Sequence, residues 1–283
     1  MTKRKKSAIL PLLPLYIVTI CLVLLPMLYM LFISFMSRGD GAGIQYVFTV
    51  ENYRKLADPA NLSILWASLK MAVQTTLITL VTGYLFAYFM AKRPEKQRDL
   101  LMLLVIIPFW TSALLRTYGW MLFLRSNGIL NNILLSIGLT DSPIKFLYND
   151  GAVLFGMAYS LLPFMILPLY ASIEKLDKAF VEASRDLGAN SFLSFVTITF
   201  PMTLPGVVSG CMLVFVPSVG LFFISDLMGG GVSMVLGNLI QYYLSSGRNW
   251  PMGAALSMVM VLLTALTMQV YRKFAGNSSL GVF

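Results

Sequence analysis

Long apolar runs alternate with shorter polar segments from one end of the chain to the other. An α-helix needs roughly 20 consecutive, mostly apolar residues to cross the hydrocarbon core of a bilayer, and most of these runs have about that length. The helices and strands of a soluble domain would instead alternate apolar and polar positions over a few residues. The pattern therefore predicts six membrane-spanning helices, over about residues 9–36, 64–91, 100–124, 151–173, 203–226 and 251–271.

Composition supports the same interpretation. Hydrophobic residues make up 58% of the 283 residues, and charged residues only 12%. This excludes a soluble globular domain, in which about a quarter of the residues are charged. We find no internal repeat, no low-complexity tract and no sign of a second domain. The chain is therefore expected to form one all-α integral membrane domain over residues 1–283.

The net charge of +9 is distributed as the predicted topology requires. Basic residues cluster at Lys3–Lys6, Lys92–Arg98 and Arg272–Lys273, whereas the three segments expected outside the cell are nearly balanced in charge. Lys and Arg concentrate in the cytoplasmic segments of membrane proteins, so we place these clusters and both termini in the cytoplasm. The positive charge thus needs no nucleic-acid partner.

Residues for catalysis or metal binding are scarce. The chain has no histidine, and no Asp/Glu cluster has the spacing of metal ligands. Cys21 and Cys211 both lie in apolar runs, which implies no disulfide framework. No G-x-x-x-x-G-K-[ST] motif is present, so ATP is not bound through a P-loop. We expect no cofactor on this chain, no enzymatic activity, and energy for any transport to come from a partner.

A polar loop over residues 174–202 separates the fourth and fifth predicted spans. Asp177 is expected to cap a short amphipathic helix, and Gly188 to end it, because glycine adopts the left-handed conformation at low cost. Ser191 is expected to cap a second short helix that Pro201 and Pro205 close. Such a protrusion suits a groove on another protein. The alternative is an amphipathic connector on the lipid headgroups.

This loop resembles the "EAA" loop of ABC importer permeases, through Glu182-Ala183-Ser184, Gly188-Ala189, Ile198, Pro201 and Pro205-Gly206. Ser184 stands where the family usually has a second alanine. The resemblance implies the type I (MetI-like) permease fold, with a cytoplasmic loop that docks on an ATP-hydrolysing subunit. On this chain the coupling residues would be Glu182, Ala183, Ser184, Arg185, Asp186, Gly188 and Ala189.

Further motifs resemble the spermidine/putrescine branch of that family: Pro108-Phe109-Trp110, Leu115–Gly119, Gly128–Asn131, Ser172–Lys178 and Ser225–Gly230. The resemblance implies a bacterial inner-membrane permease that imports polyamines by alternating access. It also implies three kinds of protein partner besides membrane lipid. These are a homologous second permease, an ATPase dimer that binds ATP and Mg, and a periplasmic polyamine-binding protein.

Polar and aromatic residues inside the spans are candidates for the solute pathway. Trp110 lies about 15 Å into its span at 1.5 Å per residue, and lipid-facing tryptophans prefer the headgroup layer. Arg116 needs a partner at this depth, and Asp226 is one candidate. Carboxylates and aromatic faces bind organic cations. The candidate set is Trp110, Arg116, Tyr118, Phe222 and Asp226.

Alternatives remain open at this stage. Trp110 is equally explained by helix packing, and Asp226 by a carboxylate that ends a helix at the water interface. The same machine could carry another cation, or an anion if Arg116 were unpaired. A passive channel needs no ATPase dock, and an integral-membrane enzyme needs catalytic groups that this sequence lacks.

Overall fold

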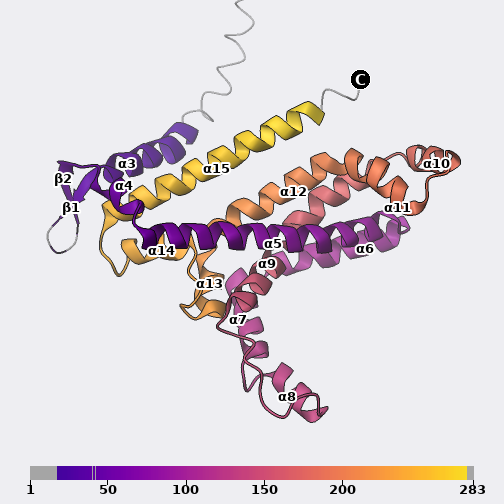
Figure 1. Cartoon of the computed structure of the whole chain (residues 1–283), viewed down its shortest axis with the longest axis horizontal. Coiled ribbons are helices and arrows are strands. Elements are labelled where there is room, and N and C mark those ends of the chain that lie inside the picture. Colours follow the sequence, from indigo (N-terminus) through magenta and orange to yellow (C-terminus); the bar gives the residue numbers. More distant parts are fainter. Residues whose placement is uncertain (1–17, 40, 42, 279–283) are drawn as a thin grey trace, which may run out of the picture. The chain divides into compact units, whose positions relative to one another are not determined.

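The computed structural model describes residues 18–39, 41 and 43–278. Its elements, drawn in Figure 1, are the π-helix Ile20–Leu24, α3 (Leu25–Ser34), β1 (Met36–Arg38), β2 (Ile44–Phe48), α4 (Glu51–Leu56), α5 (Pro59–Ala91), α6 (Glu95–Ile106), the 3-10 helix Ile107–Trp110, α7 (Ala113–Leu124), α8 (Ile129–Ser136), α9 (Asp150–Glu174), α10 (Lys178–Asp186), α11 (Ser191–Ser194), the π-helix Phe195–Thr199, α12 (Phe200–Gly220), α13 (Phe222–Gly229), α14 (Leu236–Leu244) and α15 (Trp250–Ser278).

The chain folds into two compact units. The first comprises residues up to Ser63 together with Leu239–Leu262, and the second comprises Ile64–Asn238 together with residues from Leu263 onward. In the first unit, β1 and β2 form an antiparallel hairpin. The buried Asn52 side chain closes this region by donating to the carbonyls of Ser34 (2.9 Å) and Met36 (2.8 Å).

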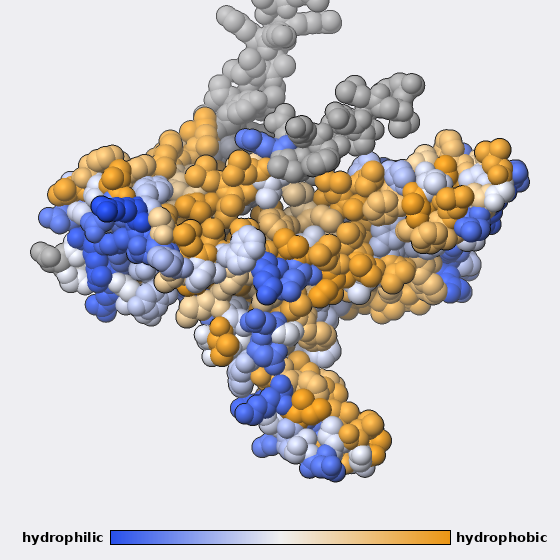
Figure 2. Space-filling model, in the orientation of Figure 1, coloured by the Kyte–Doolittle hydropathy of each residue, from blue (hydrophilic) through white to orange (hydrophobic). Residues whose placement is uncertain are grey.

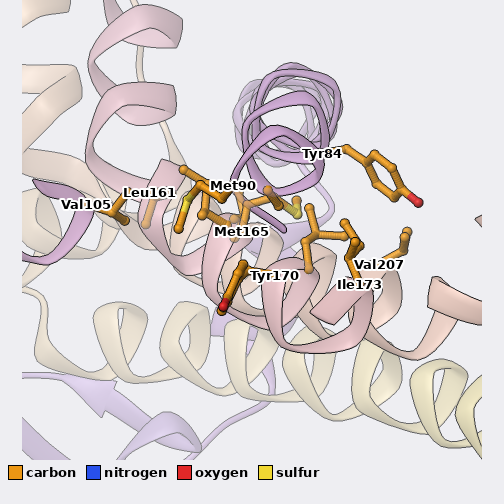
Figure 3. Close-up of a cluster of buried hydrophobic side chains, with 12 residues drawn as sticks. Tyr84, Met90, Val105, Leu161, Met165, Tyr170, Ile173 and Val207 are labelled. Carbon is orange, nitrogen blue, oxygen red and sulfur yellow. The ribbon is translucent and has the colours of Figure 1, made fainter. Parts of the chain in front are cut away.

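Helices α9 and α12 pack along each other in the second unit, and α10 and α11 lie at one end of this pair (Figure 1). Residues of α5, α6, α9 and α12 form its main apolar cluster, which Figure 3 shows in close-up: Tyr84, Ala87, Met90, Val105, Leu161, Met165, Ile166, Leu169, Tyr170, Ile173, Val207 and Val214. Gly206 allows the close approach of α12 to α9, since a Cβ there would lie 2.6 Å from the carbonyl oxygen of Pro168.

Four helices among the described residues are long and apolar enough to cross a membrane: Pro59–Ala91, Asp150–Glu174, Ser191–Gly220 and Trp250–Gln269. A fifth is added if the bent pair Glu95–Trp110 and Ala113–Ser136 forms one span. The shorter apolar helix Ile20–Ser34 belongs to the span expected over 9–36, whose first residues, like Lys3–Lys6, lie outside the described residues.

These helices remain apolar on their outer sides. Leu77, Val81 and Leu85 are spaced at i, i+4 and i+8 on α5, and all three are exposed. The surface over α5 and α12 is correspondingly hydrophobic in Figure 2. An apolar stripe of this kind suits lipid or another membrane subunit.

The segment expected as one span over 100–124 consists of two helical parts, bent by 95° at a short break. Thr111 and Ser112 have extended backbones, with ψ of 150° and 133°. Pro108 precedes the break, and its missing N–H weakens the preceding turn. The break that follows Pro108 thus divides one apolar run into two helical parts.

The fifth expected span, 203–226, differs from the structure at both ends. Asn190, not Ser191, caps the helix, because its Oδ1 accepts from the Leu193 N–H at 2.8 Å. The helix then continues through Pro201 and Pro205 to Gly220 instead of closing there. A π-helical turn directly before Pro201 is the kind of adjustment by which membrane helices tolerate proline. Leu221 (ψ 68°) separates α12 from α13.

Candidate functional site

The first short helix of the 174–202 loop has the caps that the sequence predicts. The Asp177 carboxylate accepts from the Ala179 N–H at 3.0 Å. Gly188 has φ +88°, and the N–H of Ala189 returns to the carbonyl of Ser184 at 3.0 Å. This is the pattern in which a left-handed residue satisfies the last carbonyls of a helix. The amphipathic helix and its end are therefore confirmed.

One coupling candidate is buried while its neighbours are exposed. Ser184 is buried on the side of α10 that faces α11. Its neighbours Glu182, Ala183, Arg185 and Asp186 are exposed. The Ser184 hydroxyl donates to the Val181 carbonyl at 2.8 Å, and its Oγ lies 2.7 Å from the Oγ of Ser194, which is also buried. This hydrogen bond ties α10 to α11.

Large apolar side chains project from the same loop. Leu187 is 90% exposed, Phe192 76% and Phe180 52%. Exposed apolar groups next to exposed charges are typical of a protein-docking surface, in which apolar anchors fill pockets and charges line the rim. Sequence reasoning did not identify Phe180 and Phe192, whereas Leu187 was expected on the apolar face of the first short helix.

Aromatic contacts connect the 174–202 loop to α5. The Phe195 ring packs edge-on against Tyr84 (5.5 Å between centroids) and Tyr88 (6.1 Å). The Tyr84 hydroxyl lies 2.8 Å from the Oγ1 of Thr203 on α12. A displacement of the loop would therefore be transmitted to the packed helices, because buried aromatic clusters deform little.

An ion pair forms a second connection between the loop and the helices. The Arg98 Nη1 lies 2.8 Å from Glu174 Oε1. Arg98 is in the first turns of α6, and Glu174 is both the last residue of α9 and the first of the loop. The pair thus joins the base of the loop to the helix that leads to Trp110.

The structure does not bring Arg116 and Asp226 together. In the part of the chain that it describes, these two side chains form no ion pair. The Arg116 guanidinium instead donates to the carbonyl of Pro108 and lies 5.6 Å from the Phe109 ring centroid. Its Nε is buried and has no hydrogen-bond partner among the residues that the structure describes.

Asp226 is held by a residue that sequence reasoning missed. Asn238 donates through Nδ2 to the Asp226 carboxylate and to the Phe222 carbonyl (3.2 Å). Its Oδ1 accepts from the N–H of Val235 at 2.9 Å. Asn238 therefore brings two of the five pathway candidates together and fixes the orientation of the exposed carboxylate. A polar Asn within the mostly apolar run 232–240 was the signal available in the sequence.

The remaining pathway candidates are exposed aromatics. Trp110 is 78% exposed at the end of the 3-10 helix, and Tyr118 on α7 is 45% exposed. A further aromatic group was not predicted: Trp120 packs edge-on against Phe155 (4.7 Å) and Tyr159 (5.4 Å). Phe155 and Tyr159 are four residues apart on α9, a spacing that would have placed them on one helix face.

A cavity of about 320 Å³ lies between α5, α6, α7 and α9. Its lining is mostly apolar and includes Pro108, Phe109 and Pro163, with the Arg116 guanidinium as its one charged group. Among the described residues, no group of His, Cys, Asp and Glu side chains could hold a metal ion.

The family described as "Binding-protein-dependent transport system inner membrane component" matches residues 80–276. The spermidine/putrescine transport system permease protein PotB of Escherichia coli K12 is 47% identical over 236 residues, which cover 83% of this chain and 86% of that protein. PotB of Haemophilus influenzae is 46% identical over 82% of each chain.

Solved structures show the same fold at low identity. A subunit of a bacterial ABC transporter that imports alginate superposes with a TM-score of 0.76 at 18% identity, covering 96% of both chains. A subunit of the methionine transporter MetNI in an inward-facing conformation gives a TM-score of 0.57 at 18% identity, covering 77% of this chain and 95% of that one.

Proposed function

Because this chain belongs to the family of binding-protein-dependent transport system inner membrane components, we propose that it is the permease subunit of an ATP-driven importer of spermidine and putrescine. The observation that carries the proposal is the near-50% identity to PotB proteins, which extends over more than four fifths of the chain. The chain is a multi-pass inner membrane protein, and we infer that both of its termini lie in the cytoplasm.

The proposed importer needs subunits that this chain does not supply. A homologous second permease completes the pathway, and a periplasmic binding protein delivers the polyamine. A dimer of ATPase subunits binds ATP and Mg and hydrolyses the nucleotide, so this chain itself has no enzymatic role. Alternating access then moves the solute from the periplasm to the cytoplasm.

The 174–202 loop is the proposed dock for the ATPase subunit. Exposed Glu182, Arg185 and Asp186 supply charges for the rim of the interface, and Leu187 and Phe192 supply apolar anchors. Motion of the docked loop reaches the membrane helices through the Phe195–Tyr84 contact and the Arg98–Glu174 ion pair. This pair of connections supports a mechanical role for the loop.

Asp226 and Trp110 are the proposed pathway residues of this chain, with Phe222 and Tyr118 as further aromatic surface. An ammonium group is attracted by a carboxylate and by aromatic faces, with about 0.5–2 kcal/mol for each cation–π contact. Asn238 occupies one side of the Asp226 carboxylate, and the exposed remainder is available to a passing cation. Weak sites of this kind suit a passage, because tight binding would slow release.

The test is uptake of radiolabelled spermidine by cells that depend on this importer. Asp226→Asn keeps the side-chain shape and removes the charge, and we expect uptake to fall severalfold. Asp141→Asn is the matched control, since Asp141 is an exposed carboxylate in the segment between α8 and α9. Unchanged uptake by Asp226→Asn would contradict the pathway role. Absence of polyamine uptake by the wild-type importer would contradict the substrate.

A further inference from the structure

The carbonyl of Pro108 is the point where the bent pair of helices is held. Three donors converge on its oxygen: the backbone N–H of Thr111 (3.2 Å), the Thr111 hydroxyl (2.8 Å) and the Arg116 guanidinium. The last carbonyls of a helix lack intrahelical donors and favour a nearby cation. Thr111, at the break, and Arg116, beyond it on α7, thus cap the end of the first helical part.

The same carbonyl has another donor in a continuous helix. There it would accept from the N–H of Ser112, four residues on. In the structure the backbone of Ser112 is extended, and its own carbonyl accepts from the Arg116 N–H at 3.1 Å. The Pro108 carbonyl therefore has different donors in the two conformations: the Arg116 guanidinium reaches it only across the bend, and the Ser112 N–H only in a straight helix. The Thr111 hydroxyl can bond it in both, but it matters more in the bent form, where the Ser112 N–H is missing. Such an element has two discrete states.

We call the bent connection from Pro108 to Arg116 the joint, and empty space adjoins it. The cavity of about 320 Å³ is lined by Pro108, Phe109 and Arg116 on one side and by residues of α5 and α9 on the other. Close-packed interiors resist rearrangement, whereas a cavity leaves space into which the side chains beside the break can move. The buried Nε of Arg116, which has no partner, is a spare donor for a second arrangement.

The bend sets the direction of α7 relative to Trp110. Phe109 is anchored on α9 by an edge-on contact with Phe164 at 5.2 Å between centroids. Trp110, the next residue, has no such anchor and is 78% exposed. Both residues precede the break, so a change of the angle at Thr111 and Ser112 would leave them in place and move α7, which carries Tyr118.

We propose that Thr111 and Arg116 are positioning residues that hold the 95° bend and so set the position of α7, with Tyr118, relative to Trp110, and that Arg116 leaves the Pro108 carbonyl when the importer changes its access state. The proposal rests on the proposed function only for the identity of the solute. The contacts that hold the joint all lie within this chain and do not depend on which solute is carried.

The transport test uses matched pairs in the assembled importer. Thr111→Val removes the hydroxyl and keeps the shape, and Thr111→Ser keeps the hydroxyl. Arg116→Gln removes the charge and Arg116→Lys keeps it. Loss of a hydrogen bond to a charged group changes the equilibrium constant between two conformations by about tenfold or more. We therefore expect the maximal uptake rate to fall about tenfold in Arg116→Gln and severalfold in Thr111→Val. Thr111→Ser should stay near wild type, and Arg125→Gln is the control for loss of an exposed arginine.

The KM for polyamine distinguishes positioning from direct contact. A residue that binds the solute changes KM when it is replaced, whereas a residue that holds the joint changes the maximal rate at nearly constant KM. A rise in KM as the main effect of Arg116→Gln, or equal rates for Thr111→Val and Thr111→Ser, would overturn the proposal.

A distance measurement tests the joint directly. Spin labels at Leu103 on α6 and Leu122 on α7, both exposed, report the angle in a background where Cys21 and Cys211 are replaced by serine. We expect one distance in the resting importer, a second with trapped nucleotide, and a broadened or shifted resting distribution in Thr111→Val and Arg116→Gln. Identical distributions in both nucleotide states, or in wild type and both variants, would refute the joint. This readout needs no polyamine, so it separates failure of the joint from failure of the substrate assignment.

Discussion

Ser184 and Ser194 form the one buried polar contact that joins the two arms of the 174–202 loop in the described structure. A serine at position 184 stands where the resembling family usually has alanine, and on sequence alone the change is small-for-small. The structure gives it a specific partner. A buried hydroxyl without a partner costs about 1–3 kcal/mol. Because Ser184 also donates to the Val181 carbonyl, it is Ser194 that depends on Ser184.

Ser184→Ala should therefore destabilise the loop and reduce uptake about two- to fivefold, because the Ser194 hydroxyl is left buried and unpaired. The double change with Ser194→Ala should recover most of the loss, since an apolar pair leaves no orphaned donor. Thermal unfolding of the purified importer and spermidine uptake measure both effects. A double variant as impaired as the sum of the single ones would show that the hydrogen bond is not the cause.

Gly188 has a left-handed backbone with open space around it. Its φ is +88°, and a Cβ at this position would meet no atom within 4 Å. Gly188→Val should thus act through backbone strain alone, about 1–3 kcal/mol, and misplace the residues that follow. We expect uptake to fall strongly while the protein remains in the membrane, as measured by immunoblot.

Gly188→Asn is the control for that prediction, because asparagine tolerates the left-handed region better than valine. Its uptake should lie between those of wild type and Gly188→Val. Equal and full activity of both variants would mean that the end of α10 does not position the loop.

At the scale of elements, the Arg98–Glu174 ion pair links α6 to the end of α9. Both side chains are partly exposed, at 28% and 39%, so the pair contributes at most about 1 kcal/mol to stability. Its importance is geometric. It connects the base of the proposed dock with the helix that leads to Pro108 and Trp110.

Arg98→Glu should lower the ratio of uptake to ATP hydrolysis severalfold with little change in protein level, because two carboxylates then repel each other at this junction. The exchange Arg98→Glu with Glu174→Arg restores opposite charges and should recover coupling. ATPase activity and uptake in reconstituted vesicles give the ratio. If the exchanged variant remained uncoupled, the pair would not carry the motion.

At the scale of the whole molecule, the distribution of basic residues predicts which segments face which side. Residues 92–98 and 175–200 are expected in the cytoplasm, and 37–62, 125–150 and 229–250 outside. A cysteine at Asp141 should react with a membrane-impermeant maleimide in cells with a permeabilised outer membrane, and one at Gln97 only after the inner membrane is also opened. Both positions are exposed. Reaction at Gln97 in intact spheroplasts would reverse the topology.

Hydropathy predicts a membrane-spanning all-α protein, and the resemblance of the 174–202 loop implies the type I permease fold. The all-α type I importer permease fold is confirmed by the family match and by the solved transporters. The boundaries of the spans are harder to predict from hydropathy. The described residues contain four long apolar helices, or five with the bent pair, because hydropathy records apolar length and is insensitive to the backbone angles at Thr111, Ser112 and Leu221.

Features that depend on neighbours along the chain were determined by the sequence itself. The membrane-spanning character follows from apolar length, and the caps Asp177 and Gly188 follow from hydrogen bonds and φ values within one helical turn. Only the tertiary structure decided which partners the isolated polar groups take. Arg116 turns to the Pro108 carbonyl and not to Asp226, and Asp226 pairs with Asn238. Periodicity assigns a residue to a helix face, but the angle between helices decides which polar group on another element lies within hydrogen-bond reach.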